Sequence, residues 1–109
     1  MSVRSTYAPK IIDGAEINSI INDKEFFGKG SMYAHVRLEK GGSVKWHIHT
    51  NEIEYYYILS GTGVFTNSDK TQQKIKAGDV CTMQPNGGHA IAQMGDVSLE
   101  FMALTIYIA

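Results

Sequence analysis

The chain is dominated by short runs of β-forming residues separated by turn signals. From Ser31 onward, stretches rich in Val, Ile, Tyr, Phe and Thr alternate with turns such as Gly41-Gly42 and Asn86-Gly87-Gly88. The predicted strands are 31–39, 43–49, 52–60, 63–66, 71–75, 79–83, 89–93 and 97–108. Closely spaced short strands of this kind are typical of an all-β sandwich or barrel.

Composition and length limit the classes of protein that this chain can represent. With 109 residues, 43% of them hydrophobic and a net charge of -1, it is a folded single domain without the basic excess of a nucleic-acid-binding protein. Cys81 is the single cysteine, and no apolar stretch is long enough to span a bilayer. We therefore expect a cytoplasmic protein with neither nucleic acid nor membrane as partner.

The two ends of the chain bear on its organisation. Residues 1–30 hold short apolar pairs without a sustained period, and we interpret them as an N-terminal arm packed on a barrel of residues 31–109. The last strand is apolar on both faces apart from Glu100 and Thr105, so both of its faces should be buried away from water. The arm, a second subunit or both would pack against these faces, and we expect a homodimer.

A metal site is the main functional prediction. His47 and His49 lie two apart on one predicted strand, so with Lys45 they share a face and have the spacing of a chelating pair. The next strand offers Glu52 or Glu54 as a carboxylate, and His89 follows a Gly-rich turn as a third imidazole. Such a set suits one divalent ion of Mn, Fe, Co, Ni or Zn, and it does not choose among them.

The spacing of these residues resembles the cupin superfamily. Gly41, His47, His49, Glu54 and Gly61 fall on the first cupin motif, and His89 lies eleven residues after Gly78 as in the second motif. The resemblance, which covers about residues 32–104, implies a double-stranded β-helix of the jelly-roll type that is frequently dimeric. It also implies that the metal ligands are His47, His49, Glu54 and His89. The loop before His89 departs from the second motif, with Gln84 at the usual Pro position.

Four further residues are candidates for a substrate pocket. Lys45 shares the predicted face of the histidines, Tyr56 shares the face of Glu54, and His35 and Arg37 share a face of an earlier strand. Each also has a structural interpretation: His35 as a rim residue, Lys45 as an ion-paired lysine and Tyr56 as a core aromatic. The positive or hydrogen-bonding groups of Lys45, Arg37 and His35 favour a small carboxylate or another oxyanion as ligand.

Two functions follow from this set, and they belong to different classes. The first is a small metalloenzyme acting on a small carboxylate or oxyanion, with oxalate-like or dioxygenase chemistry. The alternative is a non-catalytic module that binds a metal and a small metabolite such as a sugar or sugar acid. A purely structural metal is a third interpretation, and we rank it last because so apolar a barrel should fold without an ion. Fold resemblance alone does not assign a reaction.

Overall fold

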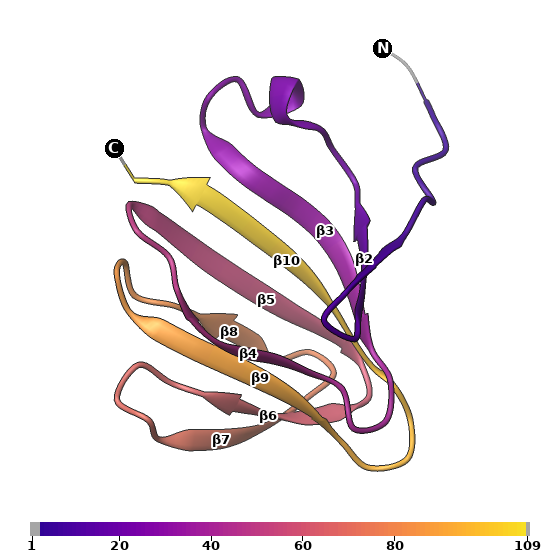
Figure 1. The fold of residues 1–109 in the computed structure, drawn as a ribbon, viewed down its shortest axis with the longest axis vertical. Helices are drawn as coiled ribbons and strands as arrows, with labels where there is room; N and C mark the ends of the chain where they lie inside the picture. Colours follow the sequence, from indigo (N-terminus) through magenta and orange to yellow (C-terminus); the bar gives the residue numbers. More distant parts are fainter. Residues whose placement is uncertain (1–2, 109) are drawn as a thin grey trace.

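The protein, described by a computed structural model over residues 3–108, is built from two antiparallel sheets packed face to face (Figure 1). One sheet has the strand order β1 (Lys10–Ile12), β2 (Ala15–Ser19), β3 (Gly30–Leu38), β10 (Leu99–Tyr107), β5 (Glu52–Ser60) and β8 (Val80–Thr82). The other has the order β4 (Ser43–Ile48), β9 (Gly88–Met94), β6 (Thr62–Thr66) and β7 (Gln72–Lys76). The predicted all-β class and the double-stranded β-helix are confirmed.

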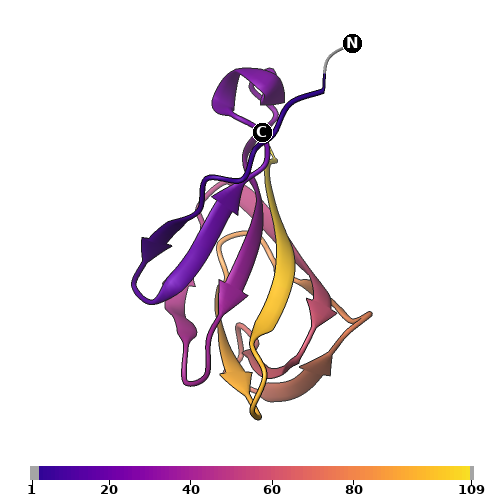
Figure 2. The same ribbon diagram turned by 90° about the vertical axis from the view of Figure 1, so that its right-hand side faces the viewer.

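The strands expected after residue 30 are all present, with bounds that differ from the prediction by no more than two residues. Residues 3–30 contribute β1, β2 and a short 3₁₀ helix (Asp23–Phe26). β2 pairs with β3 from Ala15 opposite Leu38 to Ser19 opposite Ala34, so this segment extends the six-stranded sheet at its edge (Figure 2). The division into an arm and a barrel stays a prediction, and residues 1, 2 and 109 of those two ranges lie outside the described part.

The core lies between the two sheets. Leu38, Ile58, Ile91, Leu99 and Phe101 are almost completely buried, and they come from β3, β5, β9 and β10. Burying side chains of this size contributes about 1.5–3 kcal/mol each, before the cost of ordering the chain. The apolar core therefore provides a scaffold that can position polar side chains at one of its ends.

A β-bulge in β4 changes which residues face inward. Val44 pairs with Ile91 and His47 pairs with His89, so three steps along β4 match two along β9. Val44 and His47 consequently share the inner face, whereas Lys45 is exposed. The prediction that Lys45 shares a face with the histidines is therefore wrong, because alternation of side chains holds only where the strand has no extra residue.

The Trp46 ring, displaced by the same bulge, packs over Gly88. A Cβ atom at Gly88 would lie 2.2 Å from the Trp46 Cζ2 atom, so only glycine fits beneath the indole. Lys70 covers the ring, with its Nζ atom 3.5 Å from the ring centroid. Trp46 thus links the β6–β7 hairpin to the strand pair that carries His47 and His89.

The described part of the chain contains no helix with the length and apolar character needed to cross a membrane.

Candidate metal centre

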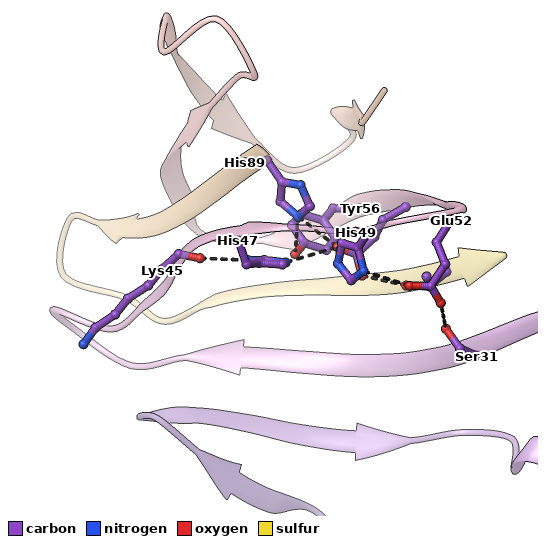
Figure 3. A network of polar contacts seen from close by, with 9 residues as sticks. Ser31, Lys45, His47, His49, Glu52, Tyr56 and His89 are labelled. Atoms are coloured by element: carbon purple, nitrogen blue, oxygen red, sulfur yellow. Dashed lines mark hydrogen bonds and ion pairs between the residues drawn. The ribbon is translucent and has the colours of Figure 1, made fainter. Parts of the chain in front are cut away.

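Three strands bring the four predicted ligands together. His47 lies on β4, His49 directly follows it, Glu54 lies on β5 and His89 lies on β9. One nitrogen or oxygen from each of these side chains lies within 4.8 Å of the others (Figure 3). The cluster, which we call the His3Glu cluster, could hold one metal ion.

The Glu54 carboxylate is the centre of the cluster. Its Oε1 atom lies 2.9 Å from His89 Nε2, 3.2 Å from His49 Nε2 and 3.8 Å from His47 Nε2. Its other oxygen, Oε2, accepts a hydrogen bond of 2.7 Å from Thr105 Oγ1. The three Nε2 atoms and one carboxylate oxygen therefore point at a common space.

Charge in the cluster is set by burial and by these contacts. Burial alone would raise the pKa of Glu54, but hydrogen bonds from His47, His89 and Thr105 outweigh it and lower the pKa far below its usual value. The Glu54 carboxylate in turn raises the pKa of His47. The Glu54 carboxylate is therefore held in its ionised form, which favours a cation between the imidazoles.

The outer ring nitrogens of two histidines are held by other atoms. His47 Nδ1 donates to the carbonyl oxygen of Lys45 at 2.8 Å, and His49 Nδ1 donates to Glu52 Oε1 at 3.1 Å. Glu52 also accepts a hydrogen bond of 2.6 Å from Ser31 Oγ. Nε2 is the ring nitrogen of both histidines that faces Glu54, and a metal would bind there after displacing any proton on that atom.

An unpartnered atom tests whether the cluster fits an ion. His49 Nε2 is buried and makes no hydrogen bond within residues 3–108, although it lies 3.2 Å from Glu54 Oε1. Buried polar atoms are rarely left without a partner, so an imidazole nitrogen aimed into a group of donors fits a missing ligand bond. The donor set of three imidazoles and one carboxylate matches a first-row divalent ion.

Comparison with known proteins gives the family. Residues 34–107 match the model described as Cupin domain. This chain belongs to the cupin family. Over 93 residues it is 38% identical to the oxalate-binding protein of Thermotoga maritima, covering 85% of this chain and 76% of that protein. An uncharacterized protein of Methanocaldococcus jannaschii is 29% identical over 90 residues, covering 83% of this chain and 71% of that protein.

Solved structures agree with the family assignment. A predicted oxalate decarboxylase from Thermotoga maritima has a TM-score of 0.91 and 34% identity, and the match covers 99% of this cupin and all of that chain. KdgF from a Halomonas species has a TM-score of 0.79 at 12% identity, covering 94% of this cupin and 88% of that chain, which shows the shared fold alone. The resemblance identified from the motifs is therefore confirmed.

Of the four predicted pocket residues, Tyr56 is the one whose side chain contacts the cluster. Its hydroxyl lies 3.4 Å from His89 Nε2, and its ring is buried against Phe65 and Phe101. Burial, together with the nearby Glu54 carboxylate, raises the pKa of Tyr56 well above its usual value. Tyr56 therefore stays protonated next to the metal ligands.

The structure does not bring His35 and Arg37 to the cluster. They alternate on β3 with the buried core residues of that strand, so they lie on the outer face of the six-stranded sheet. His35 Nε2 lies 3.0 Å from Glu100 Oε1, and Arg37 pairs with Glu39 at 2.9 Å. Lys45 contributes only its carbonyl oxygen, while its side chain points away from the histidines (Figure 3).

Sequence reasoning missed three residues that position the ligands. Ser31 and Glu52 hold His49, and Thr105 holds Glu54. Thr105 could have been found from the sequence, because it is one of two polar residues in an otherwise apolar last strand. The sequence offers Glu52 as a possible ligand, whereas its contact with Ser31 depends on a pairing between distant segments.

Proposed function

We propose that this cupin binds a small carboxylate of the oxalate type through one divalent transition ion held by the His3Glu cluster. The observation that carries the proposal is the convergence of three imidazole Nε2 atoms on one buried carboxylate oxygen. The name of the Thermotoga maritima relative, an oxalate-binding protein, supports the choice of ligand. Mn, Fe, Co, Ni and Zn all suit the donor set.

The arrangement of charges supports an anionic ligand bound at the ion. A divalent ion supplies Lewis acidity and positive charge for a carboxylate oxygen. Glu54 neutralises only part of that charge, and Arg37 and Lys45 lie outside the cluster. The ion would therefore be the main electrostatic partner of the acid, with the protonated Tyr56 hydroxyl as a neighbouring hydrogen-bond donor.

A metalloenzyme is the second candidate, and Tyr56 is the observation that favours it. A buried hydroxyl held beside the candidate ligands can donate a hydrogen bond to a substrate and so position it for reaction. We rank binding first because the other nearby carboxylate, Glu52, already accepts from Ser31 and His49 and is not a free base. Turnover of oxalate, 2-oxo acids and sugar acids by the metal-loaded protein, compared with Tyr56→Phe, separates the two functions.

The binding proposal is tested by metal content and calorimetry. The protein is purified without a His tag, and its metals are measured by elemental analysis in the wild type, in His89→Ala and in His35→Ala as a matched surface control. We expect about one ion per chain in the wild type and in His35→Ala, and none in His89→Ala. Oxalate should bind only the metal-loaded protein in isothermal titration calorimetry.

Two results would overturn the binding proposal. One is full metal content in a folded His89→Ala variant, with circular dichroism as the check on folding. The other is equal oxalate affinity before and after chelation of the ion.

We also propose that the molecule is a homodimer in the cytoplasm. Tyr57, Leu59 and Val80 are exposed side chains on the outer face of β5 and β8. Contact of such an apolar group with water is unfavourable. A second copy of this face supplies an apolar partner of the same kind. A single cysteine that is free and buried, Cys81, supports a reducing compartment.

A further inference from the structure

The His3Glu cluster is accessible from one side. The side chains of His89 and Glu54 are each 2% exposed, whereas those of His47 and His49 are 33% and 25% exposed. A ligand arriving at an ion in the cluster therefore approaches past His47 and His49. What lies next to these two imidazoles determines which substituents a bound acid can carry.

A cavity of about 360 Å³ adjoins His47 at the open edge between β2 and β4. Ala15 and Ile17 pair with Leu38 and Val36, which are core residues, so all four side chains face into the sandwich. Its apolar lining comes from Ile12, Ala15, Ile17, Val44 and Trp46, and Asp13 and Lys45 add one charge of each sign. The space next to the exposed metal ligand is therefore walled mainly by apolar groups, with the β1–β2 hairpin as one wall.

A second cavity, of about 650 Å³, has the opposite character. It is lined by amide and hydroxyl side chains, including Asn67, Thr71, Gln73 and Gln84, and it meets the cluster only at His89. The His89 ring is stacked on Phe65 with 6.0 Å between centroids, and its side chain is almost completely buried. Because the His47 side chain is far more exposed than that of His89, the cavity beside His47 is the one that an incoming ligand meets.

We propose that the cavity between the β1–β2 hairpin and β4 holds the apolar substituent of a 2-oxo acid whose carboxylate and oxo oxygens bind the ion. This rests on the proposed function, because it assigns the ligand class of the same centre. Oxalate and a 2-oxo acid share the O–C–C–O unit that binds a metal, and the 2-oxo acid replaces one oxygen by a carbon chain. A volume of about 360 Å³ corresponds to roughly a dozen water molecules, which is more space than oxalate needs.

The size of the expected effect follows from the burial of methylene groups. Each added methylene that leaves water for an apolar cavity strengthens binding by roughly two- to fourfold. Affinity for the metal-loaded protein should therefore rise in the order glyoxylate, pyruvate, 2-oxobutyrate and 2-oxopentanoate. Isothermal titration calorimetry with the protein loaded with Mn(II) measures this series, with oxalate as the reference ligand.

Two opposite substitutions, one in each cavity, test which cavity holds the substituent of the bound acid. Val44→Thr keeps the shape of a side chain in the apolar cavity and adds a hydroxyl, so the increase in affinity per methylene should flatten. Thr82→Val makes the reverse change in the polar cavity, and it should leave the increase as it is in the wild type. Ile12→Trp, at the half-exposed mouth, should block the longer acids while the shorter ones still bind.

The outcomes separate this inference from the proposed function. Oxalate binding without any gain along the 2-oxo acid series would overturn the inference and leave the proposed function standing. A gain that Thr82→Val changes and Val44→Thr does not would overturn it by placing the substituent in the polar cavity. Failure of oxalate and of every 2-oxo acid to bind the metal-loaded protein would overturn both proposals. Binding of the longer 2-oxo acids without oxalate would support the inference and overturn the choice of oxalate.

Discussion

Two histidines of the cluster are oriented by hydrogen bonds to other residues of the chain. The Lys45 carbonyl oxygen fixes the His47 ring, and the Glu52 carboxylate fixes the His49 ring. Each contact holds a proton on Nδ1 and directs Nε2 toward the Glu54 carboxylate, where an ion would bind. Folding already restricts the rotamers of these side chains. Metal binding therefore loses less side-chain conformational entropy.

The first residue-scale prediction concerns pH. In the ion-free protein, Glu54 raises the pKa of His47, so this contact stabilises the fold below the usual histidine pKa of about 6.5 and is lost as the pH rises through the raised value. The lowered pKa of Glu54 contributes stability above about pH 4.3, which is lost as the pH falls. A metal competes with the His47 proton, so it stabilises more at higher pH.

The measurement for this prediction is the melting temperature with and without bound metal. The difference between the loaded and the chelated protein should widen from about pH 6 to about pH 8. His47→Gln should reduce the widening, whereas His35→Gln, which changes an outer-face histidine, should preserve it. A difference that stays constant or shrinks over this range would contradict the assignment of His47 as a ligand.

The second residue-scale prediction concerns Thr105. Thr105→Val keeps the shape of the side chain and removes the hydrogen bond to Glu54 Oε2, which leaves a buried carboxylate oxygen without its donor. We expect a loss of about 1–3 kcal/mol in the free energy of unfolding of the ion-free protein. Metal affinity should fall by about 10- to 100-fold, because Thr105 orients the ligand.

Urea unfolding and competition with a metal-binding dye measure the two effects of Thr105→Val. Thr62→Val is the matched control, because the Thr62 hydroxyl donates to the carbonyl of Met94 at an exposed position far from Glu54. It should change stability by no more than about 0.5 kcal/mol. Equal effects of the two substitutions would show that Thr105 has no special role at Glu54.

At the scale of the strands, the turn residues allow the strand bounds to be predicted from the sequence. The bulge in β4 prevents a correct prediction of which of its side chains face inward. Gly and Asn clusters mark the ends of the strands after residue 30, and the bounds followed closely. The four ligands followed from motif spacing. Lys45 was placed wrongly because the extra residue in β4 has no signature in local composition. Ser31 and Glu52 were missed as partners because they are 21 residues apart and meet only in the folded sheet.

The strand-scale prediction concerns Gly88. In Gly88→Ala the new methyl group meets the Trp46 ring, which must move away from β9. We expect a loss of about 1–3 kcal/mol in the free energy of unfolding, a red shift of the tryptophan fluorescence, and weaker metal binding through the neighbouring His89. Urea unfolding monitored by fluorescence measures the first two effects.

A double variant tests whether the indole causes the effect of Gly88→Ala. Trp46→Leu removes the colliding ring atoms, so adding Gly88→Ala to it should cost less than it does in the wild type. If the two substitutions are additive, the cost arises from the backbone of Gly88 and the packing argument is wrong.

At the scale of the whole molecule, the outer face of the six-stranded sheet predicts self-association. Tyr57→Glu/Val80→Glu places charges on the exposed apolar part of this face, and we expect it to convert a dimer into a monomer. Light scattering coupled to size-exclusion chromatography should give twice the chain mass for the wild type. Val97→Glu, an exposed substitution in the turn before β10, should leave the mass unchanged. A wild-type monomer over a wide concentration range would contradict the prediction.

The ligands of the cluster come from both layers of the sandwich. His47 and His89 belong to the four-stranded sheet, and Glu54 belongs to the six-stranded sheet. A bound ion would therefore link the two layers, and their separation would remove some of its ligands. Opening of the sandwich and release of the ion become one event, so the melting temperature should climb with the logarithm of the free ion concentration. The free metal concentration would then add to the stability that the apolar core already provides.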